Sequence, residues 1–142
     1  MKVSVILPAR NEEKTIKPYL LELIKTLPNA EFIVVCNGCT DRTEGVVKSI
    51  KSKRIKVFSI PEAAKGLAVL FGFEKVSDTK YIGFVDGDGA FSSKVVKMII
   101  NELKKNDVAI ASKWKNKKFY EVNEPFFRKI CGRVWNFLVK LM

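Results

Sequence analysis

Apolar and polar residues follow one another along this chain in blocks of two kinds. Short apolar runs rich in β-branched residues have the length of strands, and the stretches between them carry apolar residues three and four positions apart, as helices do. The predicted strands are Val3–Leu7, Glu31–Cys36, Ile55–Ile60, Tyr81–Val85 and Asp107–Ala111. The predicted helices are Lys14–Thr26, Asp41–Lys51, Lys65–Val76 and Ser92–Lys105. Asp41 is expected to cap the second of these helices, with Glu44 completing a capping box.

Strands that alternate with helices predict an α/β fold with a doubly wound, mostly parallel sheet and helices on both faces. Ligands of such sheets bind outside the carboxyl ends of the strands, at the point where the strand order reverses. We therefore expect residues 1–112 to form the ligand-binding α/β domain. Functional side chains should lie in the loops that directly follow the strands.

Residues 113–142 have a different composition, with eight Lys or Arg against two acids. After Pro125, apolar residues recur at helical spacing and predict a final amphipathic helix. Such a helix either lies in a membrane interface, with its basic residues toward lipid head groups, or packs against the core of its own domain. The pattern leaves both possibilities open.

Charge narrows the choice of partners. The 142 residues carry a formal net charge of +11, with a pI near 9.7, which favours an anionic partner such as a nucleic acid, a phosphorylated ligand or an anionic membrane surface. No RNP, zinc-finger or helix-turn-helix signature accompanies the charge, so we expect no nucleic acid among the partners.

The chain has three cysteines and no histidine. Without histidine it cannot build a Ser-His-Asp triad, and a single C-x-x-C pair, Cys36 and Cys39, cannot supply four zinc ligands. A redox or metal role for this pair is one interpretation, but the missing second pair favours ordinary packing. The low, odd cysteine count, the absence of a signal-like segment and the lack of an apolar run near 20 residues predict a cytoplasmic location.

The sequence Asp86-Gly87-Asp88 directly follows the predicted strand Tyr81–Val85. Two carboxylates one residue apart at a strand end can share a hard divalent cation, Mg²⁺ or Mn²⁺, which would also hold a diphosphate. An ordinary Asp-Gly turn accounts for the same three residues equally well.

Polar residues also follow the first two strands. Asn11-Glu12-Glu13 comes after the first, and Asn37 opens the loop after the second. These side chains could hydrogen-bond a base or a ribose, whereas helix capping is the favoured interpretation for Thr40 and Asp41. Lys65-Gly66 opens the third helix and would suit a phosphate, although a solvated lysine beside a turn glycine is equally consistent with the sequence.

Together these segments resemble family 2 glycosyltransferases, which have a GT-A fold. The matching segments are Val5–Glu13 for the opening strand and its turn, Ile33–Thr43 for the second strand and its loop, Ala64–Gly66 for the "KG" turn and Phe84–Gly89 for the "D-x-D" loop. Ala111–Trp114 and Arg128–Leu138 are similar to the polyprenyl-phosphate branch of the family, typified by dolichol-phosphate mannosyltransferase. The resemblance spans nearly the whole chain.

The resemblance implies inverting transfer of a sugar from a GDP- or UDP-sugar, with Mg²⁺ or Mn²⁺ bound by Asp86 and Asp88. The metal would neutralise the diphosphate leaving group. Arg128 and Arg133 would bind phosphate oxygens and, with Asp88, make up the implied catalytic set. The residues implied for nucleotide-sugar binding are Pro8, Ala9, Asn11, Glu12, Asn37, Lys65, Asp86 and Gly87.

The acceptor implied by the resemblance is a polyprenyl (dolichyl) phosphate. Its anionic oxygen attacks without a general base, and the late part of the sequence offers only Glu121 and Glu124 as base candidates. The enzyme would then lie on the cytoplasmic face of a membrane as a peripheral protein. The alternative is a C-terminally short, non-catalytic nucleotide-sugar-binding domain that acts with a partner chain.

Overall fold

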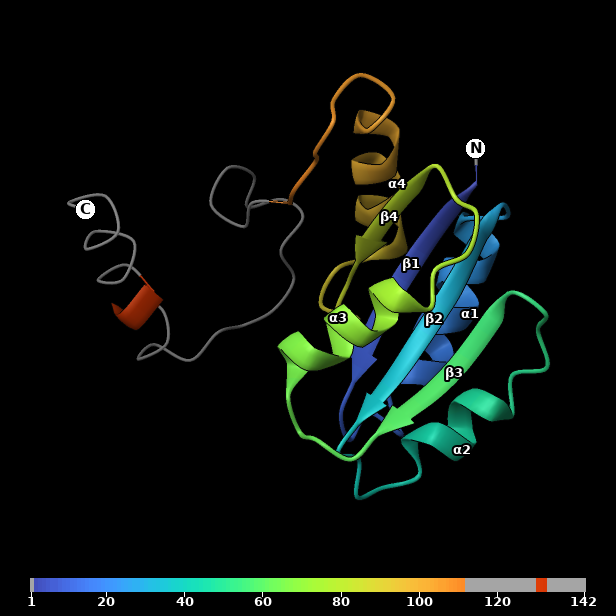
Figure 1. The fold of residues 1–142 in the computed structure, drawn as a ribbon, viewed down its shortest axis with the longest axis vertical. Helices are drawn as coiled ribbons and strands as arrows, with labels where there is room; N and C mark the ends of the chain where they lie inside the picture. Colours follow the sequence, from blue (N-terminus) through green and yellow to red (C-terminus); the bar gives the residue numbers. More distant parts are fainter. Residues whose placement is uncertain (1, 112–129, 133–142) are drawn as a thin grey trace.

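The structure is a computed structural model, and it describes residues 2–111 and 130–132. Strands and helices alternate along the described chain (Figure 1). The four strands are β1 (Val3–Ala9), β2 (Ala30–Asn37), β3 (Ile55–Ile60) and β4 (Tyr81–Phe84). The four helices are α1 (Ile16–Thr26), α2 (Thr43–Lys48), α3 (Lys65–Glu74) and α4 (Ser93–Glu102).

The strands form one parallel sheet in the order β3-β2-β1-β4. β2 and β3 extend from β1 on one side and β4 pairs with β1 on the other, so the strand order reverses beside β1. Helix α3 covers one face of the sheet, whereas α1, α2 and α4 lie on the other (Figure 1). The predicted doubly wound α/β fold is therefore confirmed.

Two apolar layers lie on the two faces of β1 and β2. Every residue of β1 is buried, as the central strand of a sheet covered on both sides requires. Val3, Val5 and Leu7 pack with α1, whereas Ile6 points to the opposite face and packs with Ala68 of α3. The near-continuous apolar run of β1 thus reports burial on two faces.

The second helix begins later than predicted, and its expected capping box does not form. Asp41 still accepts hydrogen bonds at the helix start, from the Thr43 amide at 2.9 Å and the Thr43 hydroxyl at 2.5 Å. Glu44 instead pairs with Lys48 at 2.5 Å and accepts a hydrogen bond from Ser59 at 2.6 Å. The box is replaced because β3 places Ser59 within reach of the Glu44 carboxylate.

The predicted strand Asp107–Ala111 is wrong. These residues form no strand, and Val108 and Ile110 remain 76% and 85% exposed. With Ile82 and Phe84 of β4 and Leu103 after α4, they line an apolar groove of about 460 Å³. The segment carries the alternating pattern of a strand, but within the described residues it does not reach a strand edge with which it could form a ladder.

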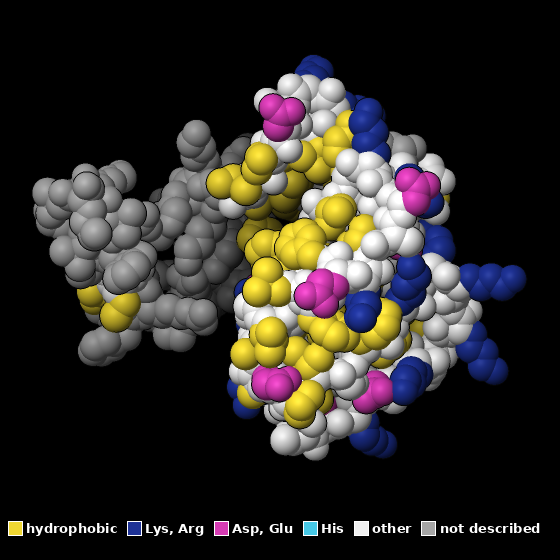
Figure 2. All heavy atoms as spheres, viewed as in Figure 1, with side chains coloured by type: hydrophobic (Ala, Val, Ile, Leu, Met, Phe, Trp, Pro, Cys, Tyr) yellow, Lys and Arg dark blue, Asp and Glu magenta, His cyan; other side chains and the backbone are white. Residues whose placement is uncertain are grey.

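Exposed hydrophobic side chains gather over α3 and β4, and Figure 2 shows them on the face that α3 covers. They include Leu67, Leu70 and Phe73 of α3 and Ile82 and Phe84 of β4. No helix in the described part of the chain is long and apolar enough to cross a membrane. The predicted segment 113–142 lies outside the described residues except for residues 130–132, which are helical, so its assignment and the boundary at residue 112 stay predictions.

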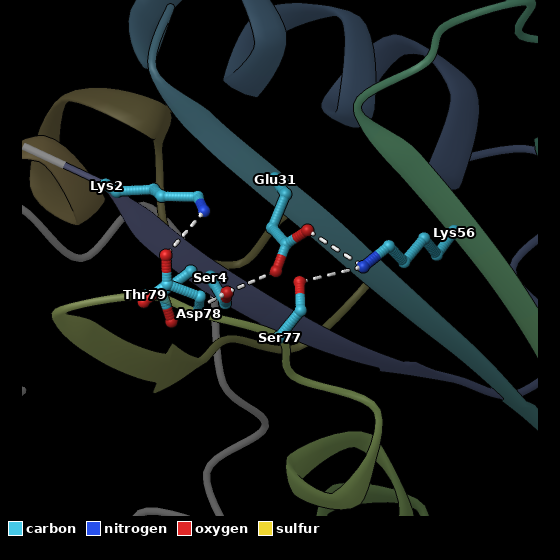
Figure 3. Close-up of polar contacts among 7 residues, drawn as sticks. All are labelled: Lys2, Ser4, Glu31, Lys56, Ser77, Asp78 and Thr79. Atoms are coloured by element: carbon cyan, nitrogen blue, oxygen red, sulfur yellow. Dashed lines mark hydrogen bonds and ion pairs between the residues drawn. The ribbon is translucent and has the colours of Figure 1, made fainter.

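A polar cluster ties the amino ends of the strands together, at the end of the sheet opposite the loops predicted to be functional (Figure 3). Glu31 of β2 accepts a hydrogen bond from Ser4 at 2.5 Å and forms an ion pair with Lys56 at 3.1 Å. Partial burial acts to raise the pKa of Glu31, but Ser4, Lys56 and Lys2 outweigh it and lower the pKa below its usual value. The ionised form of Glu31 is thus favoured by folding.

We expect the Glu31→Gln variant to lose the part of the folding stability that depends on this charge. Because the folded pKa is lowered, the contribution is fully present above the unfolded pKa of about 4.3 and is lost as the pH falls through the folded pKa. Urea midpoints of wild type and variant should therefore differ at pH 7 and converge near pH 3. Glu74→Gln, an exposed carboxylate on α3, is the control; a gap that persists at low pH would contradict the assignment.

Candidate active site

A pocket of about 280 Å³ lies beside the carboxyl ends of β1, β2 and β4, where the strand order reverses. Its lining residues are Pro8, Arg10, Glu12, Asn37, Ala63, Lys65, Asp86, Gly87 and Asp88. Side chains from four separate loops thus meet at one edge of the sheet. This is the position at which open parallel sheets bind their ligands.

The Asp86-Gly87-Asp88 loop is held against β1 by backbone hydrogen bonds. The Val85 amide donates to the Ile6 carbonyl at 3.0 Å, and the Gly87 amide donates to the Pro8 carbonyl at 3.2 Å. These bonds continue the β1–β4 ladder beyond the last residue of β4. Both aspartates therefore lie on a backbone that is fixed to the central strand.

The two aspartates make different contacts. Asp86 forms an ion pair with Lys65 at 2.5 Å, and both side chains are partly exposed. Asp88 accepts a hydrogen bond from the Ala90 amide at 2.9 Å, which closes the turn after the strand. Asp88 can therefore both close an ordinary turn and serve as a metal ligand. The bond from Ala90 uses one oxygen of Asp88 and leaves acceptor capacity on the carboxylate.

The loop after β1 is tied to the loop after β2 by short polar side chains. Asn11, at a positive φ of 56°, accepts a hydrogen bond from the Thr40 amide at 2.8 Å. The Glu12 amide donates to Thr43 at 2.7 Å, and the Glu13 amide donates to Asp41 at 3.1 Å. These contacts fix the relative positions of the two loops that border the pocket.

Asp41 takes part in the hydrogen bonds between these two loops, and they change its pKa. Slight burial acts to raise its pKa, but hydrogen bonds from Thr43 and from the Glu13 amide outweigh burial and lower the pKa below its ordinary value. Asp41 is therefore ionised at neutral pH and acts as an acceptor for backbone amides. Asp41 is not the N-cap residue that the sequence predicted: Arg42 occupies that position, and Asp41, one residue earlier, accepts hydrogen bonds from Thr43 at the helix start.

The cysteine pair lies next to the pocket. Cys36 is 2% exposed, and burial, with contributions from Cys39 and Glu44, raises its pKa to about 12. The Cys39 thiol donates a hydrogen bond to the Ala9 carbonyl at 3.3 Å. A neutral, buried Cys36 thiol is a poor metal ligand, because metals bind the thiolate, and the geometry favours the packing interpretation.

Tyr19 of α1 packs against the loop that contains Asp86 and Asp88. Its side chain is the nearest neighbour of Gly89, and its hydroxyl is buried without a hydrogen-bond partner among the described residues. Burial, and then the charges of Glu22, Asp88 and Asp86, raise its pKa. Tyr19 therefore stays neutral and fills the space between α1 and the loop.

The donor set of the pocket fits a hard divalent cation that binds together with a phosphate. No group of three or more His, Cys, Asp or Glu side chains within residues 2–111 and 130–132 is arranged to hold a metal alone. Asp86 and Asp88 offer carboxylate oxygens, and Mg²⁺ in particular is usually bound by one or two carboxylates plus substrate phosphates and water. The carboxylates present thus match a metal that a diphosphate helps to hold.

The structure brings together most of the residues proposed for the nucleotide sugar. Pro8, Glu12, Asn37, Lys65, Asp86 and Gly87 line the pocket, as does Asp88. Ala9 is 1% exposed in the core, and Asn11 joins the neighbouring loops, so neither lines the pocket. Arg128 and Arg133 lie outside the described residues. The binding and catalytic roles of all these residues stay predictions.

Two pocket residues were missed. Arg10 follows the buried end of β1, and Ala63 precedes α3. The cationic Arg10 could have been found from its place between Pro8 and Asn11 in a loop after a strand. Ala63 carries no chemical signal in the sequence, and it reaches the pocket only because the backbone after β3 passes Gly38.

Comparison with known proteins identifies the family. The family model for Glycosyl transferase family 2 matches residues 4–137, which is most of the chain. The chain belongs to glycosyl transferase family 2. The match includes every loop that borders the pocket.

Curated family 2 relatives cover nearly the whole chain. Dolichol-phosphate mannosyltransferase of Pyrococcus furiosus is 32% identical over 139 residues, which are 94% of this chain and 39% of the relative. Dolichyl-phosphate beta-glucosyltransferase ALG5D of Trichomonas vaginalis is 29% identical over 155 aligned residues, covering 96% of this chain and 47% of the relative. The chain thus spans less than half the length of these two proteins.

Solved structures of GT-A glycosyltransferases support the predicted fold. Glucosyl-3-phosphoglycerate synthase from Mycobacterium tuberculosis, in complex with Mn²⁺, UDP and phosphoglyceric acid, matches with a TM-score of 0.57 and 26% identity over 75% of this chain and 40% of that chain. S. aureus TarS 1-349 matches with a TM-score of 0.57 and 25% identity over 75% of this chain and 33% of that chain. The predicted GT-A architecture is therefore confirmed.

Proposed function

We propose that this chain is a glycosyltransferase that binds a nucleotide diphosphate sugar in the pocket beside Asp86 and Asp88. The observation that carries the proposal is the meeting of these two carboxylates with Lys65 and Arg10 at the carboxyl edge of the sheet. Anionic and cationic groups together suit a diphosphate with its divalent cation. Asn37 and Glu12 add polar side chains at the side of the pocket formed by the loops after β1 and β2.

Transfer in this proposal inverts the configuration of the sugar. Asp86 and Asp88 would hold Mg²⁺ or Mn²⁺, which when bound supplies charge neutralisation for the diphosphate leaving group. Lys65 and Arg10 place positive charge beside the same group. The hydrogen bonds of Val85 and Gly87 to β1 keep the aspartates fixed, which lowers the cost of orienting the diphosphate.

Thermal unfolding against a panel of GDP- and UDP-sugars, with and without Mn²⁺ or Mg²⁺, tests the donor site. A ligand that binds the folded state raises the melting temperature by mass action. We expect a metal-dependent increase with at least one nucleotide for the wild-type chain. We expect Asp88→Asn to weaken that binding by about tenfold or more, the scale on which losing groups that support a metal lowers its affinity.

Asp78→Asn is the matched control for that experiment. Asp78 is an exposed carboxylate paired with Lys2 at 3.4 Å, at the amino end of the sheet, and a pair of this kind contributes little to stability. The Asp78→Asn variant should keep the full nucleotide-induced rise in melting temperature. If no nucleotide shifts the wild type, or if Asp88→Asn retains the whole metal-dependent shift, the donor site is assigned wrongly.

The acceptor in the proposal is a polyprenyl phosphate, such as dolichyl phosphate. Support comes from the names of the two curated relatives and from the chemistry, because a phosphate oxygen needs no general base. Incubation with a radiolabelled donor and a short polyprenyl phosphate tests it, and Arg128→Met with Arg133→Met should lose transfer while keeping the donor shift. Donor binding without transfer by the wild type would instead favour the non-catalytic domain that acts with a partner chain.

The site of action in the proposal is the cytoplasmic face of a membrane, with peripheral attachment. The net charge of +11 supports attraction to anionic lipids. Sedimentation with vesicles that contain phosphatidylserine, compared with purely phosphatidylcholine vesicles, measures this attachment. Binding that does not depend on the anionic lipid would contradict it.

A further inference from the structure

The ion pair between Lys65 and Asp86 joins two elements across the candidate pocket. Lys65 is the first residue of α3, and Asp86 follows β4 on the backbone tied to β1. Their charged atoms are 2.5 Å apart, with side chains 58% and 37% exposed. In the part of the chain that the structure describes, this is the ion pair that engages the Asp86-Gly87-Asp88 loop.

The same carboxylate oxygen cannot serve the Lys65 ammonium and a divalent cation equally well. Mg²⁺ approaches its oxygen ligands to 2.0–2.1 Å, and Lys65 already sits 2.5 Å from Oδ1 of Asp86. A cation at this oxygen would meet a like charge at close range. Lys65 and a metal therefore compete for Oδ1 of Asp86. At the other oxygen of this carboxylate, the nearby ammonium charge would still repel the cation.

A diphosphate changes the balance of this competition. It supplies anionic oxygens beside the metal, and the long, flexible lysine side chain can turn from Asp86 to a phosphate while its backbone stays at the start of α3. The charge of Lys65 is then paired again, and Asp86 is released to the metal. Within residues 2–111 and 130–132, Asp88 has no such competitor, and its side chain accepts a hydrogen bond from the Ala90 amide.

We propose that Lys65 is a counter-ion switch that couples metal binding to nucleotide binding, by holding Asp86 until a diphosphate draws the ammonium away. This inference rests on the proposed donor site and adds a role for Lys65 beyond phosphate contact. The switch predicts two opposite effects of removing the ammonium. The affinity for the metal without nucleotide should rise, and the affinity for the nucleotide should fall. A simple phosphate-binding lysine would affect the nucleotide only.

Lys65→Met is the variant that tests the switch. Mn²⁺ alone is titrated, and its binding is measured as the loss of the free-ion signal in electron paramagnetic resonance. We expect this binding to become about fivefold tighter, which is the scale of one exposed ion pair. Binding of UDP or GDP at saturating Mn²⁺ should weaken by about tenfold, the lower end of the scale of one hydrogen bond to a charged group. Lys65→Arg, which keeps the charge, should behave like wild type in the metal-only titration.

Lys48→Met is the matched control. Lys48 also forms a 2.5 Å ion pair, with Glu44, and it lies on α2 and does not line the pocket. It should leave both affinities unchanged. Circular dichroism confirms that each variant is folded before titration.

The outcomes separate the two proposals. Tighter metal binding with weaker nucleotide binding in Lys65→Met supports the switch. If wild type shows the metal-dependent nucleotide shift but Lys65→Met binds Mn²⁺ no tighter, the switch is wrong and the donor site stands. If Lys48→Met tightens Mn²⁺ binding equally, the effect is one of overall charge and the switch is wrong. If wild type binds no nucleotide, both proposals are overturned.

Discussion

Replacing Gly72 with alanine is expected to destabilise this fold, although alanine is the better helix former. Gly72 is buried within α3 where that helix packs on β1. A Cβ at this position would overlap Cγ2 of Ile6 and lie 3.2 Å from its Cγ1. Ile6 is fully buried in the central strand, and its β-branched side chain has few alternative rotamers. Either the helix or the strand must shift, at a cost of about 1–3 kcal/mol.

Gly66→Ala provides the control in the same helix. A Cβ on Gly66 would have no atom within 4 Å, so the substitution should stabilise α3 by about 0.5–1 kcal/mol through the lower backbone entropy of alanine. Urea unfolding followed by circular dichroism measures both variants. Equal stabilisation by the two substitutions would mean that α3 can move off Ile6 without cost, contrary to the packing described.

Most of the fold was predictable because its strands differ sharply from its helices in apolar pattern. β1 and β2 are apolar on both faces, which only a covered parallel sheet explains, and α1 shows its buried residues at helical spacing. The helix starts were less predictable. α1 begins at Ile16 and α2 at Thr43, because the residues before them hold the loops beside the pocket together.

The segment 107–111 shows where local pattern fails. Val108 and Ile110 alternate with polar or small residues as in a strand, but strand formation also needs a partner edge at the right distance. In the described chain these residues line the groove beside β4 instead. The existence of a strand is a tertiary property that five residues do not encode.

The candidate site was predictable to the extent that strand ends determine it. Asn37 is the last residue of β2 and Asp86 lies two residues after β4, and both reach the pocket, as the shared carboxyl edge of parallel strands requires. Ala9 and Asn11 are as close to a strand end, yet the first points into the core and the second to a neighbouring loop. The pairing of Lys65 with Asp86 joins residues 21 positions apart, and only the packing of α3 on the sheet shows it.

Gly38→Ala is the substitution expected to damage stability and the site together. Gly38 follows β2 with a φ of +58°, a left-handed conformation that costs other residues about 1–2 kcal/mol. A Cβ there would lie 2.8 Å from the Cα and 2.9 Å from the backbone nitrogen of Ala63. Backbone atoms cannot rotate away, so overpacking adds about 1–3 kcal/mol.

The same clash reaches the pocket from both sides. Asn37 precedes Gly38, Ala63 faces it, and both residues line the pocket. Relief of the clash must displace one of them, so we expect Gly38→Ala to lose nucleotide affinity at a temperature where the variant is still folded. Gly45→Ala in α2, where a Cβ would meet nothing within 4 Å, should keep the nucleotide affinity and lose no stability. A Gly38→Ala variant that is destabilised yet binds the nucleotide with full affinity would contradict this. The donor would then not depend on this side of the pocket, and the proposed nucleotide position would have to move toward Lys65 and Asp86.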